Sequence, residues 1–264
     1  MQAPEKHRIR SAFDRAAGSY DAAAVLQRAV CARLLAALRE VPREQGADTP
    51  AGAPQLLDAG CGTGHGVGLL RRQWPRGHIT AVDFAAAMAA ITRRGGARTA
   101  LADIEALPFR DASFDGFWSS LTVQWCDHRR VLAEAARVLR PGGWLALSTL
   151  GEGTYRELRT AFAGIDRHRH TLDFSAADRL ATAAAAAGLT RIAVQRETIT
   201  LHYPDLRSLL GAVKAIGANA LGAGRRPGMM GKAAWQALTA AYERQRDDEG
   251  LPASYDVVLL TARK

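Results

Sequence analysis

The chain has 264 residues, of which 48% are apolar and 23% are charged, and its formal charge at pH 7 is +9. This composition is typical of a globular protein, and the length suits one domain or one domain with an insertion. No apolar stretch approaches the roughly 18 residues of a membrane span, and the N-terminus lacks the apolar region of a signal peptide. Three well-separated cysteines argue against a disulfide framework and a Cys-rich zinc site. We expect a cytoplasmic protein that binds no membrane, and the charge weakly favours an acidic partner.

In chain order, residues 5–40 have the apolar spacing of helices, and the Pro/Gly/Ala-rich stretch 41–54 predicts a linker. Short apolar runs then alternate with helix-compatible stretches. The runs are 55–59, 78–82, 98–101, 114–119 and 143–149, and the helical stretches are 65–73, 85–94 and 128–139. Strands that alternate with helices of this length predict right-handed βαβ units and a mostly parallel sheet.

The remainder of the chain predicts one more helix, two strands and an insertion. The Ala-rich helix covers 177–189, with Gly188 as its C-terminal cap. The strands are 190–201 and 255–262, and they enclose a helical insertion at 204–248. We therefore expect a single α/β domain over 1–264, with a helical lid at 1–40, a linker at 41–54, a ligand-binding core at 55–150, and a C-terminal part of the sheet at 151–264.

The stretch LLDAGCGTGHGVGLL, residues 56–70, places five glycines at every second position behind an aspartate. It fits neither the P-loop, which needs Lys and then Ser or Thr after the last glycine, nor the G-x-G-x-x-G pattern of dinucleotide sites. At the carboxyl end of a strand, Gly60, Gly62 and Gly64 would let a ligand touch the backbone. Asp58 would repel a phosphate there and attract a cationic or zwitterionic ligand.

Acids also follow the next two strands. Asp83 ends the second strand, at the position where a carboxylate holds ribose hydroxyls. Asp103 and Ile104 end the third strand, within reach of an adenine ring. A solvent-exposed acid for Asp83 and a helix cap for Asp103 are the alternatives. Together with the glycine loop, the acids predict a nucleoside with a positively charged amino-acid tail, which describes S-adenosylmethionine.

Five segments carry a family resemblance: LLDAGCGTG, AVDF, LADIEALPF, FDGFWSSL and VLRPGGWLALSTL. In this order, over about residues 54–150, they resemble the successive motifs of class I S-adenosylmethionine-dependent methyltransferases. The resemblance implies a Rossmann-like, seven-stranded sheet whose last strand is antiparallel, which suits 255–262. It also implies these cofactor-binding residues: Asp58, Gly60, Cys61, Gly62, Gly64, Asp83, Phe84, Met88, Asp103, Ile104 and Ser119.

The flanking segments narrow the resemblance. FDRAAGSYDAAAVLQRAV, SSLTVQWCDH and LLGAVKAIGANALGAGRR resemble the malonyl-[acyl-carrier protein] O-methyltransferases of biotin synthesis, the BioC family, and the similarity runs over nearly the full length. It implies methyl transfer from S-adenosylmethionine to the free carboxylate of malonyl-[acyl-carrier protein], an acidic partner. Malonyl-coenzyme A is a second candidate substrate.

Carboxyl methylation needs little acid–base chemistry, because a malonyl carboxylate is already ionised at pH 7. We therefore expect no catalytic acid or base, and we expect no metal, since the histidine spacing is typical of a solvent-exposed turn. The candidates for positioning the acceptor are Tyr20, Gln124, Trp125, Arg156, Lys214 and Arg225. Core packing is the alternative for Tyr20 and Trp125, and a surface role is the alternative for the cations.

Other functions remain as alternatives. The acceptor could be another small molecule, such as a quinone or a polyketide, or the protein could bind the cofactor without transferring its methyl group. A nucleic-acid methyltransferase is disfavoured, because an amino-methylating enzyme would carry [N/D]-P-P-[F/Y/W] after the fourth strand, where this chain has SSLTVQW. A cytosine-C5 enzyme would need a Pro-Cys pair, which the sequence lacks.

Overall fold

The computed structural model describes residues 6–41, 52–165, 168, 170–216 and 230–264. Within these ranges, seven strands form one sheet in the order β3-β2-β1-β4-β5-β7-β6. β7 is antiparallel to both of its neighbours, and the pairings among β1 to β5 are parallel. The strands are β1 (Gln55–Ala59), β2 (His78–Asp83), β3 (Arg98–Leu101), β4 (Phe114–Ser120), β5 (Leu139–Leu150), β6 (Thr190–Tyr203) and β7 (Leu251–Arg263). The predicted seven-stranded sheet with an antiparallel last strand is confirmed.

Two strands begin four residues earlier than predicted, because their partners extend them. β5 begins at Leu139, which pairs with Phe114 of β4. β7 begins at Leu251, which pairs with Tyr203 at the far end of β6. These ends carry proline and small polar residues, so an apolar run alone does not predict them.

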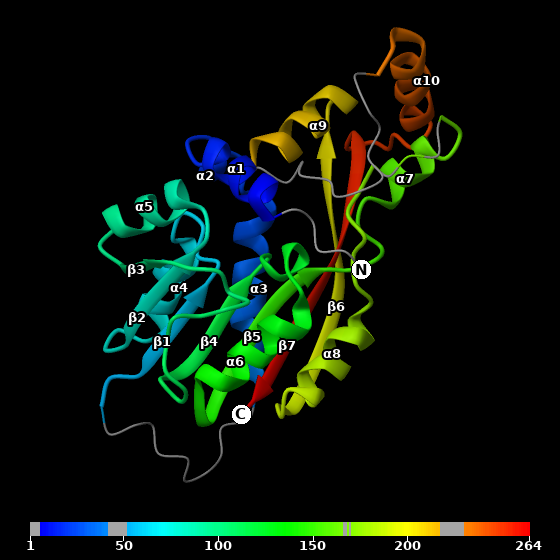
Figure 1. The fold of residues 1–264 in the computed structure, drawn as a ribbon. Coiled ribbons are helices and arrows are strands. Elements are labelled where there is room, and N and C mark those ends of the chain that lie inside the picture. Colours follow the sequence, from blue (N-terminus) through cyan, green and yellow to red (C-terminus); the bar gives the residue numbers. More distant parts are fainter. Residues whose placement is uncertain (1–5, 42–51, 166–167, 169, 217–229) are drawn as a thin grey trace.

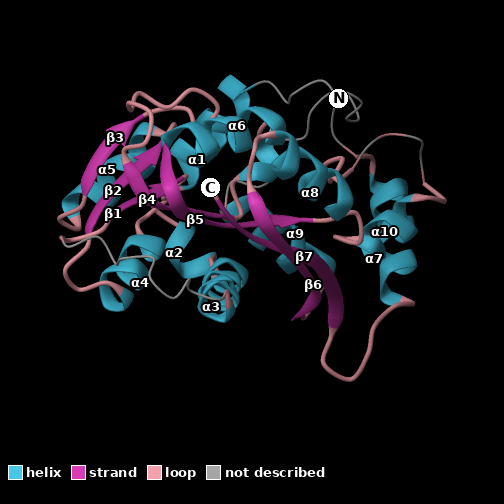
Figure 2. Cartoon of the chain, turned by 90° about the horizontal axis from the view of Figure 1, so that it is seen from below, coloured by secondary structure: helices cyan, strands magenta, loops and turns pink. Residues whose placement is uncertain are grey.

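Helices cover both faces of the sheet, with α3 and α4 on one face and α6 and α8 on the other (Figure 2). Their apolar positions recur every three or four residues, as in α6, where Val131, Leu132 and Ala135 are buried. The helices are α1 (Lys6–Ala16), α2 (Tyr20–Ala23), α3 (Val25–Glu40), α4 (His65–Gln73), α5 (Ala86–Arg94), α6 (His128–Val138), α7 (Arg156–Phe162), α8 (Ala177–Ala186), α9 (Leu206–Ala215) and α10 (Lys232–Glu243). The sequence did not predict α7, which has seven residues and follows Tyr155, a non-glycine residue at φ +57°.

The helix predicted at 177–189 ends as expected. Gly188 follows it with φ +81°, and Leu189 N–H donates back to the carbonyl of Ala184. This reversal needs a left-handed residue, which glycine adopts at little cost. Most of the predicted linker, residues 42–51, and part of the predicted insertion, residues 217–229, lie outside the described residues.

The central strands β1 and β4 are buried on both faces, as Leu56, Leu57 and Phe117 illustrate. The parallel strands end at one edge of the sheet, and α1, α2 and α9 lie over this edge (Figure 1). Among the described residues, no helix is both long and apolar enough to span a membrane. Helices from the N-terminal and the C-terminal parts of the chain therefore cover the carboxyl edge of the sheet.

Candidate active site

The glycine loop turns sharply between β1 and α4. The N–H groups of Gly60 and Cys61 both donate to the carbonyl of Val82 on β2, at 2.8 and 2.9 Å. Gly60 has φ +81°, and a Cβ placed on it would lie 2.3 Å from Oγ1 of Thr122. Only glycine satisfies both the conformation and the space, so the loop leaves its backbone open to a ligand.

Asp58 is a buried acid with an unmatched oxygen. It lies next to the end of β1, its exposed fraction is 2%, and its Oδ2 has no hydrogen-bond partner within the described part of the chain. Burial and the nearby charge of Asp83 raise the pKa of this carboxyl to about 7. Gly66 faces it closely, since a Cβ there would lie 2.6 Å from Oδ2. An unpaired buried carboxyl is costly unless a ligand supplies a donor or a positive charge.

Asp83 is held at the end of β2 by the backbone. Its Oδ2 accepts from the N–H of Gly62 at 2.9 Å, and its Oδ1 accepts from the N–H of Ala85 at 2.8 Å. Burial raises its pKa to about 6. Each carboxylate oxygen has a further lone pair, so this fixed group can still accept from two hydroxyls of a ligand.

Two adjoining cavities run along the strand ends and together form the cofactor cleft. The larger, of about 360 Å³, borders Asp58 and the glycine loop, and the smaller, of about 60 Å³, borders Asp83. They share Tyr20, Gly60, Gly62 and Ser120. The structure brings almost all predicted cofactor residues to this cleft: Asp58, Gly60, Cys61, Gly62, Gly64, Asp83, Phe84, Met88, Asp103 and Ile104.

Ser119 is the exception and is corrected by the structure. It is completely buried, and its hydroxyl donates to the carbonyl of Ala59 at 2.7 Å. The next residue, Ser120, lines both parts of the cleft instead. Successive side chains of a strand face opposite sides, so a placement that is one residue off moves the hydroxyl away from the cleft.

The N-terminal helices close over both ends of the cleft. Lys6 of α1 forms ion pairs with Asp103 at 2.5 Å and with Glu105 at 2.7 Å. At the other end, the hydroxyl of Thr63 donates to Asp21 of α2 at 2.6 Å. Lys6 and Asp21 were not predicted from the sequence, and no local pattern marks them, because their partners lie far along the chain.

A third cavity, the apolar chamber, has a volume of about 290 Å³ and adjoins the cleft. It shares Phe13, Tyr20, Leu121 and Trp125 with the smaller part of the cleft. The ring of Phe13 meets Trp125 edge to face, with centroids 5.6 Å apart. Most of the walls are aliphatic or aromatic, so this chamber excludes water better than the cleft does.

Four predicted acceptor residues meet at this chamber. Tyr20 borders the chamber and both parts of the cleft. Gln124 and Trp125 lie on the single turn of 3₁₀ helix after β4, and the Gln124 amide donates to the carbonyl of Leu121 at 2.7 Å. Lys214 of α9 is an exposed cation on the chamber wall.

The structure does not bring Arg156 to the chamber. Its side chain is 62% exposed and pairs with Glu157 at 2.9 Å, and it borders neither the cleft nor the chamber. Leu158, two residues further along α7, lines the chamber. Residues two apart on a helix face nearly opposite directions, so Arg156 points away. Arg225 lies outside the described residues.

Two tyrosines on the chamber wall were not predicted. Tyr155 has φ +57°, and its N–H donates to the carbonyl of Ser254 at 2.7 Å. Its hydroxyl donates to that of Tyr255 at 3.5 Å, and burial raises the pKa of both phenols. A strained non-glycine backbone is a feature of functional sites, but no sequence signal announces it.

The described residues contain no group of three or more His, Cys, Asp or Glu side chains arranged to hold a metal ion. A glycine-open loop, an unpaired buried carboxyl and a second carboxylate at the neighbouring strand end instead suit a nucleoside with a cationic tail. The residues present therefore fit S-adenosylmethionine.

Comparisons with known proteins agree with this chemistry. The family model described as a methyltransferase domain matches residues 57–147. A malonyl-[acyl-carrier protein] O-methyltransferase from Dechloromonas aromatica is 46% identical over 99% of this chain and 95% of its own length. A protein of the same name from Herminiimonas arsenicoxydans is 42% identical over 98% of this chain and 96% of its own.

The chain belongs to the malonyl-[acyl-carrier protein] O-methyltransferase family. It is an S-adenosylmethionine-dependent O-methyltransferase. The fold alone has wider relatives. An S-adenosylmethionine-dependent methyltransferase from Thermotoga maritima matches it with a TM-score of 0.55 and 20% identity, over 97% of this chain and 99% of that one.

Proposed function

We propose that the protein methylates the free carboxylate of malonyl-[acyl-carrier protein] in the cytoplasm, giving the malonyl methyl ester that primes the pimeloyl chain of biotin. The observation that carries this proposal is the junction of the cofactor cleft with the apolar chamber at Tyr20. The relatives' names supply the acceptor. A methyl donor on one side of this junction and a carboxylate on the other can meet in line.

We assign the cofactor contacts from the chemistry of the cleft residues. Asp58, with its unpaired oxygen, holds the ammonium group of the methionine tail. Asp83, Asp103 and Ile104 line the smaller part of the cleft, where Asp83 would accept from the ribose hydroxyls and Asp103 and Ile104 would border the adenine. S-Adenosylmethionine supplies an electrophilic methyl group when bound. The chain's part is to orient the cofactor and to exclude water.

The apolar chamber suits a carboxylate nucleophile that needs no base. An ionised carboxylate that leaves water for apolar walls loses its hydration shell, and positioning alone can supply several kcal/mol toward the displacement. Lys214 attracts the carboxylate to the chamber. We infer that Tyr20, Gln124 and Trp125 then fix its direction at the junction.

The lid and the insertion complete the site. We infer that residues 5–25 and 204–248 cover the acceptor, since α1, α2 and α9 lie over the carboxyl edge (Figure 1). Lys6 would release Asp103 when the lid opens. Cofactor and acceptor together should then protect both segments from hydrogen exchange, and equal protection without ligands would contradict a moving cover.

Charge supports a carrier-bound substrate. The chain has a formal charge of +9, and carrier proteins of this class are acidic, so electrostatic steering should raise the association rate. Methylation also removes the negative charge of the chain end. The ester can then enter an apolar elongation site that would reject a carboxylate at a cost of several kcal/mol.

Transfer of radiolabelled methyl groups tests the proposal. Malonyl-[acyl-carrier protein], malonyl-coenzyme A, a small quinone and acetyl-[acyl-carrier protein] are compared at equal concentration.

We expect the highest kcat/KM with malonyl-[acyl-carrier protein]. This kcat/KM should decrease as the salt concentration rises, because salt screens electrostatic steering. Malonyl-coenzyme A should react more slowly at every salt concentration. Acetyl-[acyl-carrier protein] should take no label, since it has no free carboxylate. Labelling of the acetyl form, or preference for the quinone, would overturn the assignment.

A further inference from the structure

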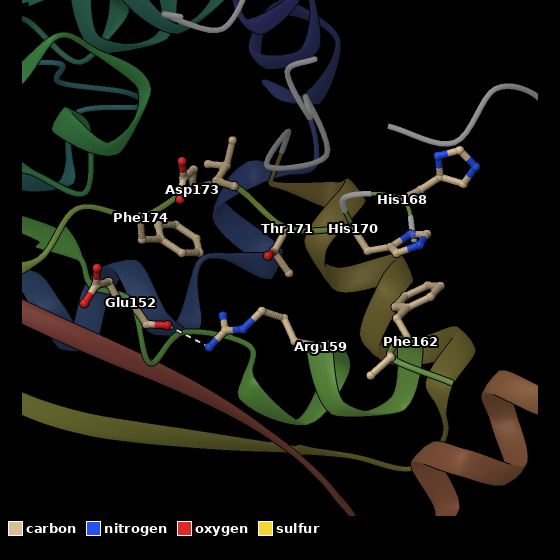
Figure 3. Close-up of a pocket in the computed structure, with 10 residues that line it drawn as sticks. Glu152, Arg159, Phe162, His168, His170, Thr171, Asp173 and Phe174 are labelled. Carbon is tan, nitrogen blue, oxygen red and sulfur yellow. Dashed lines mark hydrogen bonds between the residues drawn. The ribbon is translucent and has the colours of Figure 1, made fainter. Parts of the chain in front are cut away.

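A further cavity, the outer cavity, lies beside the apolar chamber and has a volume of about 510 Å³. The segment 170–174 borders both spaces, because His170, Thr171, Leu172 and Phe174 line the two of them. Figure 3 shows the side chain of Arg159 extending from α7 toward the backbone of Glu152, below Phe174 and Thr171. Neither the cofactor contacts nor the methyl transfer proposed above uses this cavity.

Among the described residues, Arg159 is a cation held in place without a carboxylate partner. Its guanidinium donates to the main-chain carbonyls of Thr154 and Glu152, the latter at 2.7 Å (Figure 3). Carbonyl oxygens orient a guanidinium without neutralising it. In the described part of the chain, no carboxylate lies within ion-pair distance of Arg159, whereas Arg156 on the same helix pairs with Glu157.

A pre-oriented guanidinium suits one class of ligand. Its planar array of N–H donors matches the oxygens of a phosphate better than a lysine does. Anchoring by two carbonyls reduces the side-chain entropy that binding would otherwise cost. The outer cavity therefore offers a place for a phosphate ester.

The remaining walls are mixed: Glu152, Asp173 and two histidines are polar, and the apolar part suits the body attached to that phosphate. Phe162, Leu172 and Phe174 contribute apolar surface, and the ring of His170 stacks on Phe162 with centroids 3.4 Å apart (Figure 3). The arm that carries a malonyl thioester has this composition, since phosphopantetheine joins a phosphate to a dimethyl-substituted carbon, two amides and the sulfur. The segment 170–174 leads from this cavity to the chamber where the thioester end would lie.

We propose that the outer cavity binds the phosphate end of the phosphopantetheine arm through Arg159, and that the arm passes the segment 170–174 to reach the apolar chamber. This inference rests on the proposed function and adds the location of the arm. Arg159 acts here as a binding residue for the substrate and takes no part in the transfer of the methyl group.

Inhibition of malonyl-[acyl-carrier protein] methylation tests the site with two compounds that differ only in the phosphate. We expect phosphopantetheine to inhibit the unmodified enzyme about fivefold to tenfold more strongly than pantetheine, as for a partly exposed charge-assisted contact. Arg159→Gln should remove this difference and raise KM for the carrier by a similar factor, with kcat retained. The matched control, Arg156→Gln, removes the same charge from the same helix and should keep the difference.

Each outcome decides the question. Equal inhibition by the two compounds, inhibition by neither, or a phosphate preference that survives Arg159→Gln would overturn the site.

Calorimetry with S-adenosylmethionine checks that the Arg159→Gln variant is folded. If it is not, Arg159→Lys replaces it, and the phosphate preference should fall to about half or less, because lysine keeps the charge but loses the planar fork; an unchanged preference contradicts the site. Methylation of malonyl-[acyl-carrier protein] by the unmodified enzyme tests the proposed function separately.

Discussion

The cofactor cleft and the apolar chamber share the wall formed by Phe13, Tyr20, Leu121 and Trp125, yet the rest of their walls differ in polarity. The cleft presents an open backbone and two buried carboxyls, those of Asp58 and Asp83, whose pKa values burial raises to about 7 and about 6. The chamber presents mostly aliphatic and aromatic side chains. One region recognises a charged ligand by complementary groups, and the other removes water from a reacting group. Changes in the cleft should therefore impair binding, and changes at the junction should impair turnover.

The strongest test of this division is Asp83→Asn, which keeps the shape of the side chain. We expect the affinity for S-adenosylmethionine to fall by about 1.5–3 kcal/mol, or roughly tenfold to 150-fold, because hydrogen bonds from the ribose lose their charged acceptor. Calorimetry measures the dissociation constant. Asp111→Asn, at an exposed acid outside the cleft, is the control. An unchanged constant in folded protein would contradict the assignment of Asp83.

Asp58→Asn should separate stability from binding. The raised pKa of Asp58 means that the folded, cofactor-free protein binds more protons than the unfolded chain between about pH 4 and about pH 7. Its stability contribution is therefore present at low pH and is lost as pH rises through this window. At pH 8 the free energy of unfolding of the variant should be about 2 kcal/mol higher than that of the unmodified protein, because the variant lacks the buried charge.

The same variant should bind the cofactor more weakly. Affinity in the unmodified enzyme should increase as pH rises through about 7, since the ionised Asp58 pairs with the ammonium group. Asp58→Asn should abolish the increase between pH 7 and pH 8 and keep the increase near pH 6 that belongs to Asp83. Urea denaturation at pH 5 and pH 8 measures stability, and calorimetry at pH 5, pH 6, pH 7 and pH 8 measures affinity. A variant that is less stable at pH 8, or that keeps the increase between pH 7 and pH 8, would show that Asp58 has another partner.

Tyr20→Phe tests whether Tyr20 acts on the acceptor at the junction. We expect kcat to fall about tenfold, or about 1.4 kcal/mol, because the ring remains while the hydroxyl that helps direct the carboxylate is lost. The dissociation constant of S-adenosylmethionine should stay within about twofold. Single-turnover methyl transfer measures the first quantity and calorimetry the second. A change in cofactor binding alone would assign Tyr20 to the cleft and not to the acceptor.

Lys6→Met has the smallest expected effect and tests the lid. The ion pairs with Asp103 and Glu105 are partly exposed, so we expect them to stabilise the closed lid by about 0.5–1 kcal/mol. Their loss should make the release of cofactor roughly twofold to fivefold faster. Stopped-flow dissociation measures the rate. Lys232→Met on α10, an exposed position outside the cleft, is the control. Equal release rates in the two variants would argue against a latch at Lys6.

The sequence by itself determined the sheet and the cofactor side of the site. Parallel strands bring their carboxyl ends to one edge, so residues that follow apolar runs, such as Asp58, Asp83 and Asp103, could be placed together before any contact was known. Glycine requirements are local in the same way, as the φ of +81° at both Gly60 and Gly188 illustrates. Local rules do not decide, however, which of two neighbouring residues lines the cleft. Ser120 faces the cleft, whereas Ser119 faces away from it.

Only the tertiary structure decided the other walls. Lys6 meets Asp103 and Tyr155 meets Tyr255 across about a hundred intervening residues, and their positions follow from how helices pack on the sheet. The direction of Arg156 and Arg159 depends likewise on α7, a short helix whose start at Tyr155 has an unusual backbone. Such contacts arise from the sum of many small packing energies. The local sequence around each residue contains no pattern that predicts them. The sequence therefore indicated Tyr20, Gln124, Trp125 and Lys214 on the acceptor side, and the remaining walls became visible only once the chain was folded.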